Sequence, residues 1–345
     1  CVRENAENRL FGHLGNLKPL KDKNPGLLIA VCGCMAQQSS VWERIIQNHP
    51  YVDLIFGTHN LHRLQELITK LREPVGRDGC LIEIWEEGER EEDLPIRRDD
   101  PYRAWVTVIY GCNNFCSYCI VPSVRGRERS RHPEKVLAQV RRLAAEGVKE
   151  VTLLGQNVNS YGSDLAEKER IDFADLLTMI NQIEGLRRIR FQTSHPKDLS
   201  ERLIRAMAEG EKICEHLHLP VQAGSNRILA AMNRKYTREH YLGLIKNLRG
   251  YIPKITITTD IIVGFPGERD EDFDQTMDLV KEVGFDGAFT FAYSPRPGTR
   301  AALLPEQVEE EIKMNRLYQL IELVNKLAKQ SNQRLEGKIE SVLVE

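Results

Sequence analysis

Three cysteines near the middle of the chain have the spacing that a metal centre needs. Cys112, Cys116 and Cys119 follow one another as C-x3-C-x2-C, directly after a predicted strand. Three thiolates on one loop can bind three corners of a four-iron cluster and leave the fourth iron open to a ligand. Zinc is the alternative, but zinc motifs favour a second pair of cysteines, which the sequence does not supply. The spacing therefore favours an iron–sulfur cluster.

Five cysteines lie outside this motif. Cys1 opens the chain, Cys34 follows a predicted strand, and Cys32 lies two residues before it. Taken alone, Cys1 and Cys34 are more readily explained as buried structural cysteines, because a thiol packs like a small apolar group, and Cys32 is interpreted as a core residue or as a neighbour of Cys34. We interpret Cys80 and Cys214 as structural. Eight cysteines without a secretory signal indicate a cytoplasmic protein, where clustered thiols more often bind metals than form disulfides.

Polar or glycine-containing loops follow the other predicted strands of the same region. They include Gln156 and Asn157, Ser194, Gln222, the run of Val263 with two glycines, and residues 293–299. Each could be an ordinary turn, and a lone histidine such as His195 is more often packed than catalytic. Together the loops predict one ligand-binding face, because the carboxyl ends of parallel strands meet at one edge. Arg234 could meet a cofactor carboxylate or RNA.

Four arginines directly follow the cysteine motif, at alternating positions. They are Arg125, Arg127, Arg129 and Arg131. If this segment is extended, their side chains point to one face, and such a row can grip phosphates. A solvated loop with surface ion pairs is the alternative. Because the formal net charge is −2, RNA binding would have to come from a local patch of this kind.

The elements that position these residues begin with an incomplete α/β domain over residues 1–75. The predicted strands are 27–32 and 52–56, and the predicted helices are 40–48 and 61–71. Residues 76–101 are interpreted as a linker that contains an acidic run. No run of about 18 apolar residues occurs, so no membrane span is predicted. We expect a monomer.

Residues 102–334 alternate predicted strands with helices six times. The strands are 104–109, 150–154, 188–191, 216–219, 255–263 and 287–291. Six such units in series imply a parallel sheet curled into a partial (β/α)6 barrel. A long helix over 307–335 follows, and then a single strand over 338–344. Residues 335–345 are therefore expected to begin a small β module that the chain does not complete.

The cysteine motif after the first strand of a partial barrel resembles the radical S-adenosylmethionine superfamily. The resemblance implies that Cys112, Cys116 and Cys119 hold a [4Fe-4S] cluster whose open iron binds S-adenosylmethionine. The cofactor would then be cleaved to methionine and a 5′-deoxyadenosyl radical. Tyr118 matches the aromatic position near the adenine. On this basis we expect cofactor contacts from six further residues: Gln156, Asn157, Ser194, Gln222, Arg234 and Val263.

The surroundings of Cys1 and Cys34 are similar to the N-terminal domain of the methylthiotransferases. In that family three cysteines bind an auxiliary [4Fe-4S] cluster, which is implied to carry the sulfur that a second S-adenosylmethionine methylates. Cys1 and Cys34 match the second and third ligands, and the first would lie upstream. The resemblance implies a truncated flavodoxin-like domain, a radical barrel, and the start of the RNA-binding TRAM domain.

Residues 155–162 read G-Q-N-V-N-S-Y-G and favour the branch that methylthiolates adenosine in tRNA. The implied reaction places a methylthio group on C2 of N6-isopentenyladenosine beside the anticodon. The implied partners are tRNA and a reductase or flavodoxin-type electron donor. Ser117 and Tyr118 stand where Thr and Phe are expected, and Arg300 where Pro is expected, which puts little in doubt. The alternatives are a ribosomal-protein aspartate or threonylcarbamoyladenosine as substrate, or a non-catalytic iron–sulfur protein that binds tRNA.

Overall fold

The computed structural model describes residues 4–73, 79–85, 97–167 and 170–344, without the side chains of residues 4 and 5. The chain divides into two units. The first is Cys1–Arg97 together with Cys119–Arg127, and the second is Arg98–Tyr118 together with Glu128–Glu345. No helix in the described ranges is long and apolar enough to cross a membrane.

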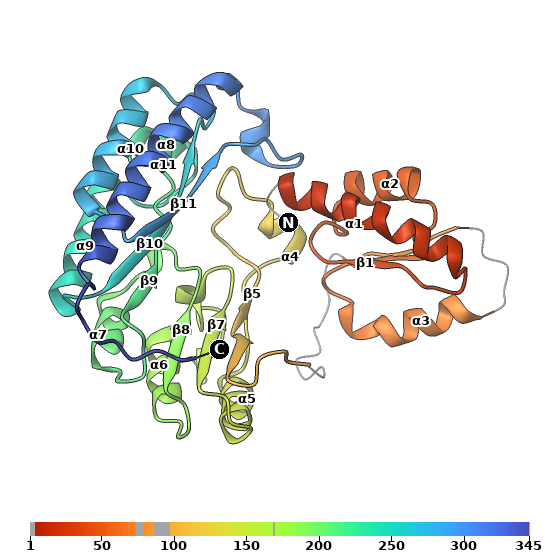
Figure 1. The fold of residues 1–345 in the computed structure, drawn as a ribbon, viewed down its shortest axis with the longest axis horizontal. Coiled ribbons are helices and arrows are strands. Elements are labelled where there is room, and N and C mark those ends of the chain that lie inside the picture. Colours follow the sequence, from red (N-terminus) through yellow and green to blue (C-terminus); the bar gives the residue numbers. More distant parts are fainter. Residues whose placement is uncertain (1–3, 74–78, 86–96, 168–169, 345) are drawn as a thin grey trace. The chain divides into compact units, whose positions relative to one another are not determined.

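The first unit is built on a three-stranded parallel sheet with the order β1-β2-β3. Its strands are β1 (Ala30–Cys32), β2 (Leu54–Phe56) and β3 (Leu81–Glu83). Its helices are α1 (Glu4–Lys23), α2 (Ser39–Asn48), α3 (Leu64–Arg72) and the short α4 (Val121–Arg125), with a 3-10 turn η1 (Leu61–Arg63). Figure 1 shows α1 and α2 on one side of this sheet and α3 on the other.

Apolar residues on both faces of this sheet explain its covering by helices. Val31 and Ile55 belong to the core that includes Leu14 of α1 and Ile45 of α2. Leu54, Phe56 and Leu67 form a smaller core under α3. Parallel strands buried on both faces are typical of α/β domains. The strands and helices predicted for this domain are confirmed. The prediction of a linker over residues 76–101 is wrong at residues 81–83, because these residues form β3.

The second unit contains six parallel strands in chain order, as predicted for the barrel. They form two three-stranded sheets, β4-β7-β8 and β9-β10-β11, with an isolated parallel bridge between Ile189 and Ile213. The strands are β4 (Arg103–Thr107), β7 (Glu150–Leu154), β8 (Arg188–Phe191), β9 (His216–His218), β10 (Thr256–Val263) and β11 (Gly287–Ala292). A small antiparallel pair joins β5 (Ile109–Tyr110) to β6 (Arg129–Ser130).

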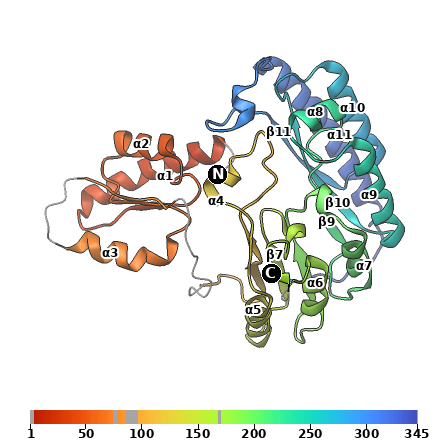
Figure 2. The ribbon, with the colours of Figure 1, turned by 180° about the vertical axis from the view of Figure 1, so that it is seen from behind.

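Helices cover the outer face of these strands, as Figure 2 shows from behind. They are α5 (Pro133–Ala145), α6 (Phe173–Asn181), α7 (Glu201–Glu209), α8 (Asn226–Ala231), α9 (Arg238–Tyr251), α10 (Asp270–Val283) and α11 (Glu310–Gln333). Three 3-10 turns are η2 (Val158–Ser160), η4 (Pro196–Asp198) and η5 (Arg300–Leu303). Val106, Leu153, Ile189, Leu217 and Ile261 point from the strands into this core.

Local sequence signals fix where these helices begin. Asp172 and Asp175 form a reciprocal capping box at α6, and the Ser200 hydroxyl accepts a hydrogen bond from the Leu203 N–H at α7. Thr237 caps α9 in the same way. After α11 the chain has no strand over 338–344, so that prediction is wrong. A strand needs a neighbour for its backbone groups, and the structure pairs this segment with none of the described strands.

Candidate active site

The loop that carries Cys112 and Cys116 leaves β5 and is held in an unusual backbone conformation. Phe115, between the two cysteines, has a φ of 49°. Such a left-handed conformation is uncommon for a bulky residue and persists only where the surroundings enforce it. Cys112 is half-buried, and burial raises the pKa of its thiol. Its Sγ accepts a hydrogen bond of 3.5 Å from the Asn114 side-chain amide.

The segment that follows α8 clamps this loop. The Ser117 N–H donates to the Met232 carbonyl at 3.0 Å, and the Ser117 hydroxyl donates to the Ala231 carbonyl at 2.9 Å. The side-chain amide of Asn233 donates to the Phe115 carbonyl at 2.8 Å. Asn233 itself has a φ of 56°. The cysteine loop is therefore fixed by backbone contacts from a distant part of the same unit.

Arg234 lies directly after this clamp and is buried, with 8% of its surface exposed. Its Nη1 donates to the Cys116 Sγ and to the Tyr118 hydroxyl, each at 3.4 Å. Its Nε donates to the Tyr236 hydroxyl at 2.8 Å, and its Nη2 donates to the Pro220 carbonyl at 2.9 Å. Burial excludes the alternative that Arg234 meets RNA. The structure brings it instead to one of the predicted metal ligands.

Buried polar atoms without partners gather where β7, β8 and β9 end. Among the described residues, no hydrogen-bond partner exists for Asn157 Oδ1, Ser194 Oγ, His195 Nε2 or Gln222 Oε1. Thr193 and Gln222 also have left-handed backbone, with φ values of 69° and 71°. Nearly all buried polar groups in proteins are hydrogen-bonded, so unpaired ones in adjacent loops point to a ligand. Asn157, Ser194 and Gln222 are three of the predicted cofactor residues.

His195 is a site residue that the sequence did not predict. Its Nδ1 accepts a hydrogen bond of 3.2 Å from the Lys197 N–H, so we assign the ring hydrogen to Nε2, the atom without a partner. Burial, with the nearby charges of Arg234 and Lys197, lowers the pKa of His195 to about 2. The ring packs edge-on against Tyr236, 5.6 Å between centroids. It is therefore a neutral donor at physiological pH.

Tyr293, which follows β11, is a second site residue that the sequence did not predict. Its hydroxyl is buried without a partner in the described part of the chain, and burial raises its pKa. It lies in the 293–299 loop that the sequence singled out, but a tyrosine in a loop gives no signal of its burial. The position of His195 directly after a predicted strand was a signal for a site residue. It was outweighed by the general observation that a lone histidine is more often packed than catalytic.

Two predicted cofactor residues have other surroundings. Gln156 is half-buried beside Asn157. Val263 is fully buried in the core, and its carbonyl accepts a hydrogen bond of 2.9 Å from the Tyr293 N–H. The Val263 side chain packs in the core of the unit, and the cofactor contact expected of this residue stays a prediction.

The predicted row of arginines does not form one face. Arg125 ends α4, Gly126 follows with a φ of 76°, and Arg129 lies in β6, so the segment is not extended throughout. Arg131 is only 3% exposed and donates to the Thr107 carbonyl at 2.8 Å and to Gln139 at 2.7 Å. The RNA prediction is therefore wrong for Arg131. The helix and turn break the alternation on which the row depended.

In the first unit, Cys34 is half-buried and its Sγ accepts a hydrogen bond of 3.1 Å from the Arg125 Nε. Cys1 lies outside the described residues. Cys32 is exposed, so it is not a core residue, and the alternative that it is a neighbour of Cys34 remains. Cys119 belongs to the first unit and is half-buried. Among the described residues, no three His, Cys, Asp or Glu side chains are already grouped as metal ligands.

The hydrogen bonds to three cysteine sulfurs test whether the residues fit an iron–sulfur cluster. A thiol is a weak acceptor, whereas a metal-bound thiolate carries charge and attracts amide and guanidinium donors. Cys34 and Cys116 each accept from an arginine, and Cys112 accepts from an amide. Donors of this type aimed at sulfur fit cluster ligands better than buried structural thiols.

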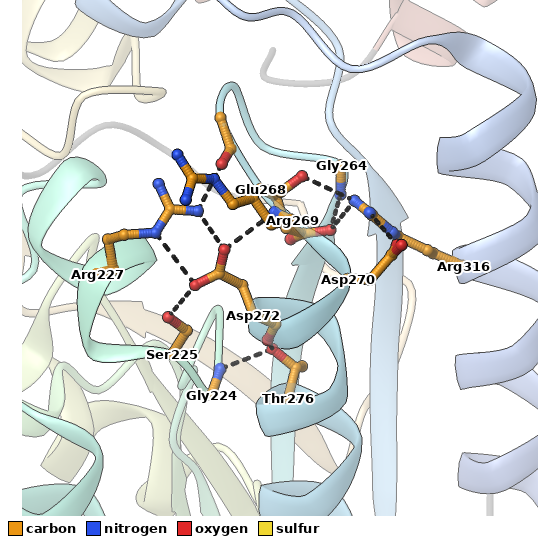
Figure 3. Close-up of polar contacts among 11 residues, drawn as sticks. Gly224, Ser225, Arg227, Gly264, Glu268, Arg269, Asp270, Asp272, Thr276 and Arg316 are labelled. Carbon is orange, nitrogen blue, oxygen red and sulfur yellow. Dashed lines mark hydrogen bonds and ion pairs between the residues drawn. The ribbon is translucent and has the colours of Figure 1, made fainter.

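A network of ion pairs fixes the loops after β9 and β10, as Figure 3 shows. The Gly264 N–H donates to Glu268 at 2.8 Å, and Arg316 of α11 pairs with Glu268 at 2.9 Å and with Asp270 at 2.7 Å. Burial raises the pKa of Glu268, although Arg316 opposes the shift. Asp272 accepts from the Ser225 hydroxyl at 2.6 Å and pairs with Arg227. These contacts tie two site loops to α10 and α11.

The inner face of the strands exposes aromatic and polar side chains. Trp105 on β4 is 60% exposed and Phe289 on β11 is 59% exposed. The His218 ring meets Phe289 edge-on at 6.0 Å, and its Nδ1 lies 3.0 Å from the Thr258 hydroxyl.

Comparison with known families places both units. A model of the Radical SAM superfamily matches residues 106–280, and a model of the Uncharacterized protein family UPF0004 matches residues 1–57. A tRNA-2-methylthio-N(6)-dimethylallyladenosine synthase of Pelotomaculum thermopropionicum is 57% identical over 347 residues, covering 100% of this chain and 76% of that protein. The enzyme of that name from Carboxydothermus hydrogenoformans is 55% identical over 345 residues, covering 100% and 77%.

Two solved structures share the fold. A cobalamin-dependent S-adenosylmethionine radical enzyme with aqua-cobalamin bound has a TM-score of 0.57 and 14% identity, covering 92% of this chain and 46% of that one. The coproporphyrinogen III oxidase of Escherichia coli, a radical SAM enzyme, has a TM-score of 0.52 and 16% identity, covering 68% and 57%. At these identities the likeness concerns the fold alone.

Proposed function

The chain belongs to the radical S-adenosylmethionine methylthiotransferases, in the family of tRNA-2-methylthio-N(6)-dimethylallyladenosine synthases, and we propose that it methylthiolates N6-isopentenyladenosine in tRNA. The observation that carries the proposal is identity of 55–57% with such enzymes along the whole chain, through both units. The cysteine motif and the unpaired polar atoms around it lie within the superfamily match.

The chemistry explains why such a site needs a cofactor. The target hydrogen is on an unactivated aromatic carbon, and no side-chain base removes it usefully as a proton. A cluster with S-adenosylmethionine supplies a radical that can take it as an atom. We assign Cys112, Cys116 and Cys119 to this cluster, and Cys1 and Cys34 to an auxiliary cluster.

The protein's own groups hold and orient the cofactor and substrate. Asn157, Ser194, Gln222 and the neutral His195 offer unpaired donors and acceptors to a polar cofactor. Pre-organised groups of this kind lower the cost of binding because they are already desolvated and in place. The exposed rings of Trp105 and Phe289 suit the base and its apolar substituent.

We propose tRNA and an external one-electron donor, of reductase or flavodoxin type, as partners. Of the four predicted arginines, Arg125, Arg127 and Arg129 remain candidates for phosphate contact. Arg129 lies over the Tyr110 ring at 5.3 Å, which orients its guanidinium. Each such contact should make tRNA affinity more sensitive to salt.

The test uses purified protein reconstituted anaerobically with iron and sulfide. It is incubated with dithionite, S-adenosylmethionine and isopentenylated tRNA that lacks the methylthio group, and the digested nucleosides are measured by mass spectrometry. We expect 2-methylthio-N6-isopentenyladenosine. The matched controls are the same tRNA without the isopentenyl group, tRNA with threonylcarbamoyladenosine, and ribosomal protein.

The outcomes separate the alternatives. If 5′-deoxyadenosine forms but the methylthio group appears only on threonylcarbamoyladenosine or on an aspartate, the substrate proposal is wrong. If neither 5′-deoxyadenosine nor any methylthio product forms in protein with verified cluster content, the chain is a non-catalytic iron–sulfur protein.

A further inference from the structure

Arg234 is a buried cation whose partners include no carboxylate. Its guanidinium donates to the Pro220 carbonyl, to the hydroxyls of Tyr118 and Tyr236, and to the Cys116 sulfur. Burial raises the pKa of Tyr236 to about 12, so this phenol is neutral. Cys116 is therefore the partner that carries negative charge once it binds a metal.

Arg316, another buried arginine of this unit, behaves differently. Arg316 is 5% exposed, comparable to Arg234, but it pairs with the carboxylates of Glu268 and Asp270, as Figure 3 shows. Burying a charge is costly unless an opposite charge compensates it. In Arg316 the positive charge is compensated by carboxylates of the polypeptide. In Arg234 the compensating negative charge has to come from the metal centre that Cys116 binds.

The surroundings of Arg234 hold its charge at this place. Two hydrogen bonds, to the Tyr236 hydroxyl and the Pro220 carbonyl, fix the guanidinium, and the neutral His195 ring packs against Tyr236. Met232 and Asn233, which immediately precede Arg234 in sequence, hold the cysteine loop through their hydrogen bonds to Ser117 and Phe115. The distance between the guanidinium and Cys116 is therefore set by the fold.

We propose that Arg234 is the fixed counter-charge of the radical cluster, acting through Cys116 to favour its one-electron reduction. The inference rests on the proposed function, because it takes Cys116 as a cluster ligand. Reduction adds one electron from an external donor and makes the cluster one unit more negative, with no bond formed or broken. A buried positive charge beside a ligand sulfur stabilises the more negative state, since charges interact strongly where water is excluded.

The experiment measures the reduction potential of this cluster alone. A Cys34→Ala background disables the auxiliary site, and electron paramagnetic resonance follows a dithionite titration. In Arg234→Gln, we expect the ratio of reduced to oxidised cluster at a given potential to fall about tenfold, which is about 59 mV for a one-electron couple. Arg234→Lys keeps the charge and should shift this ratio by less than about threefold.

One control separates the charge at this place from charge elsewhere in the unit. Arg238→Gln removes an arginine of the same unit that pairs with Glu282. It should leave the potential unchanged. Iron content and thermal unfolding of each variant are measured in parallel, so that a variant that fails to fold is recognised.

The proposal is overturned if Arg234→Gln retains its cluster with the wild-type potential, or if Arg234→Lys shifts the potential as far as Arg234→Gln does. If Arg234→Gln does not hold a cluster, the result for Arg234→Lys decides between the outcomes. A cluster at the wild-type potential in Arg234→Lys supports the counter-charge proposal, and loss of the cluster in both variants overturns it. The reduction potential is measured without tRNA. A failure of the substrate proposal in the nucleoside assay can therefore be distinguished from a failure of the counter-charge proposal.

Discussion

At the scale of single residues, the site is marked by groups whose hydrogen bonds are not completed by the described polypeptide. Asn157, Ser194 and Gln222 could be predicted from sequence, because polar residues after parallel strands gather at one edge of a sheet. His195 and Tyr293 could not be predicted, because burial and the lack of a partner are properties of the packed molecule. The same holds for the contact between Arg234 and Cys116.

The burial of His195 predicts a pH effect on stability. The pKa of this residue is about 2 in the folded protein and about 6.5 when unfolded. Its folded pKa is depressed, so the unfolded chain binds an extra proton between these values. Its contribution is therefore fully present above pH 6.5 and falls as pH drops toward 2, by about 1.4 kcal/mol per pH unit.

Urea unfolding of the apoprotein and of His195→Gln between pH 5 and 7 checks this. Below about pH 6 the wild type should lose stability faster than the variant, and their difference should change by about 1.4 kcal/mol per unit. Parallel curves for the two proteins over this range would show that His195 is not held neutral by burial.

At the scale of the elements, periodicity predicted the six strand–helix repeats, and the structure confirms them. Three features were predicted wrongly, two because strand pairing depends on residues far away in sequence, and one because a local helix and turn interrupt a segment that was expected to be extended. The sequence of β3 predicts a linker, but the segment pairs with Leu54–Phe56. The sequence of residues 338–344 predicts a strand, but this segment pairs with no described strand. The arginine row reads as extended, but α4 and Gly126 interrupt it.

The packing of the loop after β9 on α10 predicts a sharp effect of one methyl group. A Cβ on Gly224 would lie 2.5 Å from the Gln275 carbonyl oxygen and 2.5 Å from the Thr276 Cα, which are backbone atoms. Because helical backbone cannot easily move, Gly224→Ala should destabilise the protein by about 1–3 kcal/mol, measured by urea unfolding.

Gly243 provides the matched control. It lies inside α9, and a Cβ there would meet nothing within 4 Å. Gly243→Ala should therefore stabilise the protein by about 0.5–1 kcal/mol, because alanine loses less backbone freedom in a helix. Equal effects of the two substitutions would contradict the close packing of Gly224 against α10.

At the scale of the whole molecule, the predicted metal ligands of the described chain lie in both units: Cys34 and Cys119 in the first, and Cys112 and Cys116 in the second. Cys34 in the first unit and Cys116 in the second each accept a hydrogen bond from an arginine of the same unit. The family matches span both units, and we propose two tasks for the two groups of cysteines: delivery of sulfur for Cys1 and Cys34, and radical chemistry for the central motif. The sequence could predict this division only through its resemblance to the family.

The division of tasks is tested most directly by comparing Cys34→Ala and Cys116→Ala, reconstituted anaerobically and supplied with dithionite, S-adenosylmethionine and isopentenylated tRNA. In each reaction 5′-deoxyadenosine and the methylthio nucleoside are measured together. The account predicts that Cys34→Ala still forms 5′-deoxyadenosine but no methylthio nucleoside, and that Cys116→Ala forms neither. A methylthio nucleoside from either variant would contradict it.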